Sequence, residues 1–91
     1  MTREEILLTA KGYITKDRAA THGDAENNFA TIAHYWNVYL KDKPLISSFD
    51  VAMMMALFKV ARVQSNNSHI DSYIDACGYM AIAGELGAKC A

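Results

Sequence analysis

Two apolar stretches separated by one short polar run dominate the second half of this chain. Residues 48–63 and residues 69–86 each repeat apolar side chains at the three- and four-residue spacing of a helix, and residues 64–68 have the composition of a loop. Helices joined by so short a loop pack side by side in opposite directions. The pattern therefore predicts a helical hairpin around which the rest of the chain folds.

The charges inside this hairpin are few and matched in sign: Lys59 and Arg62 on its first helix, Asp71 and Asp75 on its second. We call these four residues the charged seam. Because each helix rises about 1.5 Å per residue, residues whose numbers sum to about 134 lie side by side in a hairpin that turns near residue 67. Lys59 is therefore predicted to face Asp75. Arg62 is predicted to face Asp71 or Ser72.

The charged seam has two interpretations. It is either an ion-pair ladder that fixes the register of the two helices or a site that serves a function. Moving four charges out of water in a small core is rarely more favourable than apolar packing, so a seam of this kind is often retained for function.

Capping signals locate the other helices. Three pairs have capping-box spacing: Thr2 with Glu5, Ser47 with Asp50, and Ser68 with Asp71. The first pair predicts a helix from residue 2 to about residue 20. An apolar stripe predicts another over residues 25–40, with Pro44 preventing its extension. Gly87 is predicted to end the last helix.

The composition is that of one globular domain over residues 1–91, with 52% hydrophobic residues and a net charge of -1. The fold class is predicted to be all-α, a small bundle of about four helices. The helix over 48–63 is apolar on nearly all sides and must be covered on every face. We therefore expect homo-oligomerisation to complete the bundle, with the interface at Met53, Met54, Leu57 or Phe58.

Charge and cysteine usage exclude several classes of protein. The near-neutral charge does not suit bulk binding to DNA or to an anionic membrane. The first residues are charged and no signal-peptide pattern follows, and no apolar run reaches the ~20 residues of a membrane span. Cys77 and Cys90 do not form a disulfide framework and lack partners at zinc-ligand spacing. We expect a cytoplasmic protein with free thiols and no bound cofactor.

A second candidate site surrounds the start of the helix over 25–40. Arg18, His22 and Asn28 gather there, where free backbone N–H groups suit a phosphate. Asp24 and Glu26 occupy the same region and oppose an anion, unless a metal ion or the cations of the charged seam intervene. The alternative interpretation is a capped turn between two helices.

Taken together, these residues resemble a family of short phage and prophage proteins of unassigned function. The resemblance covers residues 18–85. It is carried by Arg18, His22-Gly23-Asp24, Asn27-Asn28-Phe29, Ile32-Ala33, Trp36, Tyr39-Leu40, Asp50-Val51-Ala52-Met53-Met54, Lys59-Val60-Ala61-Arg62, His69, Asp71-Ser72, Asp75 and Gly78-Tyr79.

A partial resemblance is to the MazG-like all-α nucleoside triphosphate pyrophosphohydrolases. Enzymes of that family work as oligomers and bind Mg²⁺ through a Glu-x-x-Glu on one helix and a Glu-x-x-Asp on the next helix, so the resemblance implies the same arrangement. In this chain Asp71 and Asp75 occupy the place of the Glu-x-x-Asp pair, with one more residue between them than in that motif. Lys59 and Arg62 occupy the place of the Glu-x-x-Glu pair. Mg²⁺ prefers oxygen donors, so this replacement removes half of its ligands. Two cations instead favour direct binding of phosphate.

Three functions remain open. The first is a binder of a phosphorylated nucleotide without turnover, which in a phage context means sequestering a host signalling nucleotide and so countering a defence. Phosphate would be contacted by Lys59 and Arg62, with Arg18 and His22 as further contacts and Asp75 orienting Lys59. Binding of nucleotides without turnover would identify this function.

The second function is a MazG-like pyrophosphohydrolase, whose Mg²⁺ would be held by carboxylates from Asp71, Asp75, Asp50 or Glu26. Mg²⁺-dependent release of pyrophosphate would identify it.

The third function is that of a protein-interaction module whose charged seam is purely structural. Such a protein would neither bind nucleotides nor turn them over. Of these, a protein that is not an enzyme is favoured.

Overall fold

The structure is a computed structural model that describes residues 1–17, 25–41 and 44–90. These residues form four α-helices: α1 (Arg3–Gly12), α3 (Ala25–Leu40), α4 (Ser48–Ser65) and α5 (Ile70–Cys90). One π-helical turn, η1 (Tyr13–Asp17), follows α1. No strand occurs in the described ranges. The predicted all-α class with about four helices is confirmed.

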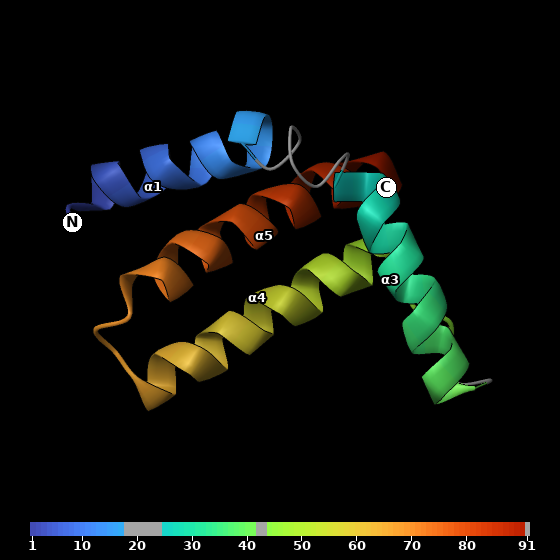
Figure 1. Cartoon of the computed structure of the whole chain (residues 1–91). Coiled ribbons are helices and arrows are strands. Elements are labelled where there is room, and N and C mark those ends of the chain that lie inside the picture. Colours follow the sequence, from blue (N-terminus) through green and yellow to red (C-terminus); the bar gives the residue numbers. More distant parts are fainter. Residues whose placement is uncertain (18–24, 42–43, 91) are drawn as a thin grey trace.

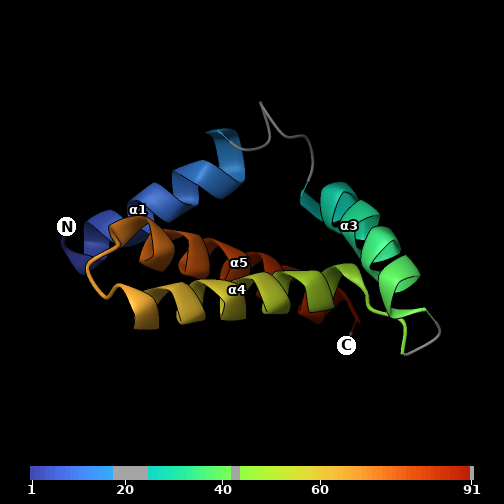
Figure 2. The ribbon, with the colours of Figure 1, turned by 60° about the horizontal axis from the view of Figure 1, so that its bottom comes forward.

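The helices α4 and α5 form the predicted hairpin, side by side and in opposite directions (Figure 1). Helix α1 lies along the side of α5 away from α4, and α3 crosses the hairpin at the end opposite the loop between α4 and α5. The same arrangement is visible after a turn of 60° (Figure 2). The Tyr73 hydroxyl closes the hairpin loop by donating to the Asn67 carbonyl at 2.9 Å.

Two of the three predicted capping boxes are present. Thr2 Oγ1 accepts from the backbone N–H of Glu5 at 3.2 Å, and the Thr2 N–H donates to the Glu5 carboxylate at 2.8 Å. The hydrogen bond from the Thr2 backbone N–H, followed by one from the Thr2 side chain, lowers the pKa of the Glu5 carboxyl. Ser47 and Asp50 pair in the same way at the start of α4. Each box satisfies N–H groups that have no partner within the helix.

The prediction of a third capping box, formed by Ser68 and Asp71, was wrong. The Ser68 hydroxyl donates to the Asn66 side-chain oxygen at 2.9 Å, and the Ser68 N–H bonds to the same oxygen. Ser68 is therefore part of the loop, and α5 begins at Ile70. The Ser72 N–H bonds to the His69 carbonyl oxygen at 3.1 Å as the helix starts.

The first helix also differs from its prediction. Its α-helical part ends at Gly12, and the chain continues as the π-helical turn η1 to Asp17, while the predicted end near residue 20 lies outside the described residues. Glycine is a weak helix former, and π-helix, although rare, occurs mostly as a single turn that widens a helix locally. Residues 18–24, with the site candidates Arg18 and His22, lie outside the described ranges.

The main core lies where α3 crosses α4 and α5. Its fully buried members come from all three helices, and a ring of partly buried apolar side chains surrounds them. The buried members are Phe29, Ala33, Val51, Ala52 and Ala83. The rings of Phe29 and Tyr79 pack 6.0 Å apart. Burying these side chains supplies most of the attraction between helices.

Two glycines of α5 sit where another helix approaches closely. A Cβ at Gly78 would lie 3.0 Å from Cγ2 of Ile14, and one at Gly87 would lie 3.1 Å from the Phe49 ring. The expectation that Gly87 ends the last helix was wrong, because α5 continues to Cys90. Gly87 serves packing against Phe49 instead of terminating the helix.

Candidate functional site

The central contact of the charged seam joins the two arms of the hairpin. Lys59 Nζ lies 3.1 Å from Asp75 Oδ2. Their side chains are 15% and 22% exposed, so the pair lies at the edge of the helix interface and keeps part of its hydration. The predicted pairing of Lys59 with Asp75, and the register from which it came, are confirmed. The pair links two helices and orients the Lys59 ammonium.

Arg62 was predicted to face Asp71 or Ser72, and it forms no ion pair with Asp71 in the described part of the chain. Ser72, which is fully buried, occupies the interior position next to α4, and its hydroxyl lies 2.7 Å from His69 Nδ1. Consecutive residues on a helix point about 100° apart, so Asp71 is turned outward and is exposed. The structure thus leaves Arg62 without the carboxylate partner that was expected.

Arg62 lies instead beside an aromatic ring. Its guanidinium carbon is 5.3 Å from the centroid of the Phe58 ring, and Lys59 Nζ is 5.5 Å from the same centroid. Both distances are within the range of cation–π attraction. Phe58 is 49% exposed, although it is a large apolar side chain. An exposed ring with two neighbouring cations is the feature that sequence reasoning missed, because it considered Phe58 as a candidate for the oligomer interface.

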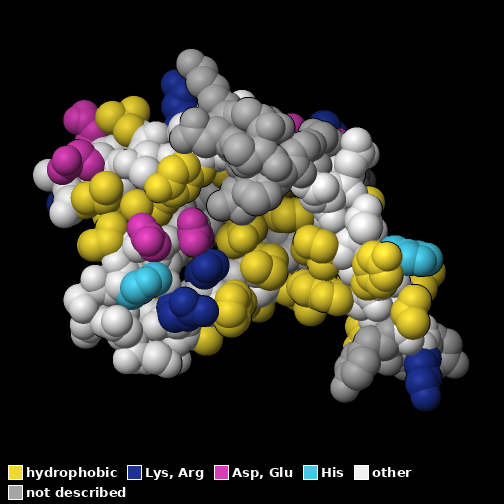
Figure 3. Space-filling model, in the orientation of Figure 1, with side chains coloured by type: hydrophobic (Ala, Val, Ile, Leu, Met, Phe, Trp, Pro, Cys, Tyr) yellow, Lys and Arg dark blue, Asp and Glu magenta, His cyan; other side chains and the backbone are white. Residues whose placement is uncertain are grey.

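We call Phe58, Lys59 and Arg62 the α4 flank. Figure 3 shows acidic and basic side chains side by side over α5 and α4, next to apolar side chains that extend towards α3. The α4 flank combines positive charge with an aromatic surface. Such a combination suits a ligand that carries both a phosphate and a flat ring.

The remaining candidates for phosphate contact are only partly placed. Asn28 is half-buried near the start of α3, and the next residue, Phe29, packs against Tyr79 one turn along α5 from Asp75. Arg18 and His22 are outside the described residues.

The carboxylates of the proposed Mg²⁺ site are divided between the two ends of the hairpin. Glu26 pairs with Lys89 at 3.6 Å, near the end of α5, and Asp50 caps the start of α4. Asp71 and Asp75 lie near the start of α5, where Asp75 is paired with Lys59. Within the described ranges no three His, Cys, Asp or Glu side chains come together as a metal site. The set of four carboxylates is therefore not assembled as expected.

The described helices also bear on the expectation about membranes. None of them combines the length and apolar character that crossing a bilayer requires. The only free cysteine with a described side chain is Cys77, which is half-buried on α5.

Comparison with known proteins identifies one family whose sequence model matches most of this chain. The family described as "Domain of unknown function (DUF6378)" matches residues 5–87. The Gene 55 protein of Mycobacterium phage L5 is 39% identical over 81 residues, which is 89% of this chain and 51% of that protein. The Gene 55 protein of Mycobacterium phage D29 is 40% identical over 76 residues, which is 84% of this chain and 49% of that protein.

The chain spans about half the length of these curated relatives. No solved structure matches it. The predicted resemblance to short helical phage proteins is confirmed, and the family match extends it to α1. The partial resemblance to MazG-like pyrophosphohydrolases finds no support in these matches.

Proposed function

We propose that this chain, which belongs to the DUF6378 family and has phage relatives, binds a phosphorylated nucleotide on the α4 flank without turnover. One observation carries the proposal. The Arg62 guanidinium has no carboxylate partner among the described residues and lies with Lys59 beside the exposed ring of Phe58. A cation left unpaired next to an exposed aromatic surface is available to a ligand.

The chemistry of the α4 flank matches the two parts of a nucleotide. The planar fork of Arg62 suits two phosphate oxygens, and the Lys59 ammonium adds a point charge held in place by Asp75. The Phe58 ring offers a face for the base, and stacking of this kind is worth roughly 1–3 kcal/mol per base. Arg18, His22 and Asn28 are further candidates for phosphate contact.

Binding without turnover is favoured by the other engagements of the carboxylates. Asp75 is paired with Lys59, Asp50 caps α4, and Glu26 pairs with Lys89. Each of these carboxylates therefore has a structural role in this fold. In a phage context, we propose that the protein sequesters a host signalling nucleotide in the bacterial cytoplasm and so counters a host defence.

We propose further that the protein works as a homo-oligomer. The chain exposes 6394 Å², whereas a folded monomer of 10.1 kDa exposes about 5,300 Å². The excess of about 1,100 Å² resembles the ~800 Å² that each partner buries in a standard interface. The radius of gyration, 13.8 Å, also exceeds the ~12 Å of a compact chain of this length.

The exposed centre of α4 is the surface that a second copy would cover. Met54 and Leu57 lie there, and Leu57 is 64% exposed. Met53, another candidate for the interface, packs against the core and is available only in part. Phe58 borders this surface, so an interface over Met54 and Leu57 places the α4 flank of one copy beside the other copy.

The decisive experiment is a thermal-shift screen of the intact protein against mononucleotides, dinucleotides and cyclic oligonucleotides, with and without Mg²⁺. Any nucleotide that raises the melting temperature is then incubated with the protein and analysed by chromatography for products. We expect a Mg²⁺-independent shift and unchanged nucleotide. Release of pyrophosphate would contradict binding without turnover, and no shift with any nucleotide would leave a protein-interaction module as the better proposal.

A further inference from the structure

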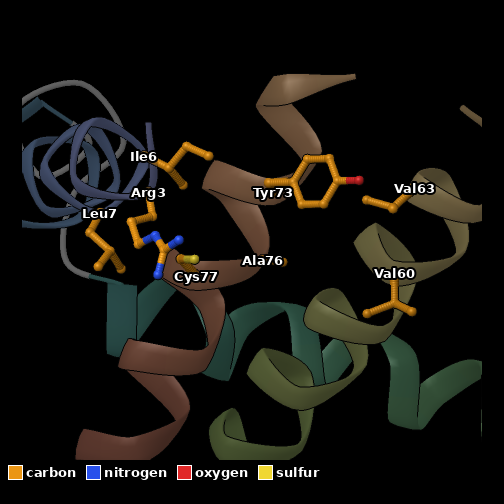
Figure 4. Close-up of a pocket in the computed structure, with 8 residues that line it drawn as sticks. All are labelled: Arg3, Ile6, Leu7, Val60, Val63, Tyr73, Ala76 and Cys77. Carbon is orange, nitrogen blue, oxygen red and sulfur yellow. The ribbon is translucent and has the colours of Figure 1, made fainter. Parts of the chain in front are cut away.

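A cavity of about 460 Å³ is lined by residues of α1, α4 and α5, and none of the three residues of the α4 flank lines it. Figure 4 shows its lining side chains, which come from all three helices. Its apolar walls include Ile6 and Leu7 of α1, Val60 and Val63 of α4, and Ala76 and Cys77 of α5. Cavities of 300–1,000 Å³ with mainly apolar walls are typical of small-molecule sites.

The cavity has few polar groups among its lining residues. Arg3 is the charged side chain among its lining residues. The Tyr73 hydroxyl, also at the cavity, is already committed to the Asn67 carbonyl, so Tyr73 offers mainly its ring. No carboxylate lies within ion-pair distance of Arg3 in the described ranges. The cavity therefore combines an apolar interior with one unpaired positive charge.

We propose that this cavity binds a free anionic amphiphile, a straight apolar chain that ends in a single carboxylate. The carboxylate pairs with Arg3, and the chain lies against the aliphatic walls contributed by α4 and α5. A guanidinium and a carboxylate form a two-pronged, charge-assisted hydrogen bond, whereas a neutral or cationic head group forms none. This site and its ligand are independent of the nucleotide proposed for the α4 flank.

The test uses decanoate, with decanol and decyltrimethylammonium as neutral and cationic probes of equal chain length, all below their micellar concentrations. Isothermal titration of the intact protein is expected to show one decanoate per chain and much weaker binding of the other two. Affinity is expected to rise about fourfold for each methylene added from hexanoate to decanoate. Equal binding of decyltrimethylammonium and decanoate would overturn the proposal.

Two variants assign the site. Arg3→Gln is expected to weaken decanoate binding about tenfold, while Lys11→Gln, which changes a charge of α1 outside the cavity, leaves it unchanged. Ala76→Leu fills the cavity and is expected to abolish binding, while Ala81→Leu on the exposed side of α5 does not. Each variant is checked for an unchanged circular dichroism spectrum and melting temperature before titration.

Cys77 supplies a readout at the site itself. In a Cys90→Ser background, the rate at which a thiol reagent modifies Cys77 is expected to fall when decanoate is present. Unchanged labelling, or equal affinities of wild type and Arg3→Gln, would reject the proposal. If Ala76→Leu instead changes the oligomeric state measured by light scattering, a second copy occupies the cavity and the amphiphile does not.

Discussion

The ammonium nitrogen of Lys59 lies 3.1 Å from Oδ2 of Asp75, across the boundary between α4 and α5. The pair is neither fully buried nor fully exposed. Its contribution to stability therefore falls between that of a surface ion pair and that of a buried one. The same contact holds Lys59 at the edge of the α4 flank.

Removing one member of this pair is expected to destabilise the fold. Asp75→Ala leaves a partly buried ammonium without its partner and should lower the free energy of unfolding by about 2 kcal/mol. Asp71→Ala is the matched control: its side chain is exposed and unpaired with the seam cations, so the expected change is below about 0.5 kcal/mol. Urea unfolding measures both. Equal losses for the two variants would show that the ion pair contributes nothing specific.

Exchanging one cation for the other tests the proposed ligand. Arg62→Lys keeps the charge but loses the planar fork, and it should weaken binding of a nucleotide identified in the thermal-shift screen by roughly 1–3 kcal/mol. The affinity of wild type should also fall with added salt, because an exposed phosphate contact is screened. Calorimetric titration gives both values. Identical affinities for wild type and Arg62→Lys would remove Arg62 from the site.

A charge at the centre of the exposed surface of α4 tests self-association. Leu57→Glu places carboxylates at the proposed interface, where they would be desolvated, and is expected to give monomers by light scattering at micromolar concentration. Val38→Glu serves as the control, because Val38 is similarly exposed but lies on α3. A monomeric wild type would contradict the proposal directly. Dissociation by Val38→Glu alone would move the interface to α3.

The glycines of α5 are expected to respond in opposite directions to the same substitution. Gly84→Ala meets no atom within 4 Å and should raise stability by up to about 1 kcal/mol, the helix-propensity difference between the two residues. Gly78→Ala places a methyl group 3.0 Å from Cγ2 of Ile14, a stiff β-branched side chain. That variant should melt at a lower temperature than wild type. A higher melting temperature for Gly78→Ala would mean that α1 and η1 shift easily.

The hairpin and its ion pair were predictable because helical rise fixes which residues of two connected antiparallel helices face each other. The pairing of Lys59 with Asp75 could therefore be predicted by counting residues along the chain. The same counting gave Arg62 two possible neighbours, Asp71 and Ser72, and no ion pair joins Arg62 to Asp71 among the described residues. Ser68 belongs to the loop, so Ser72 takes the interior position and Asp71 points outward.

Other features of the fold depend on contacts between segments that lie far apart in the sequence, and the spacing of residues within one helix does not predict such contacts. The side-chain amide of Asn37 exchanges two hydrogen bonds with the backbone of Ile46, at 2.9 and 3.1 Å. This clamp ties the end of α3 to the approach to α4. The cavity next to Arg3 was equally hidden, since its walls come from three helices. Long-range packing decides such features, and periodicity reports only which face of one helix is apolar.

The position of α1 has a consequence for the order in which the protein folds. The hairpin partners α4 and α5 are neighbours in the chain and can pair as soon as both have been synthesised, whereas α1 packs on α5, the last of the described helices. Domains fold during synthesis from the N-terminus, but α1 must wait for its docking surface to leave the ribosome. The face of α1 that packs on α5, around Ile6 and the buried Ala10, therefore stays uncovered until α5 has been synthesised, and it is open to capture by chaperones or proteases during that time.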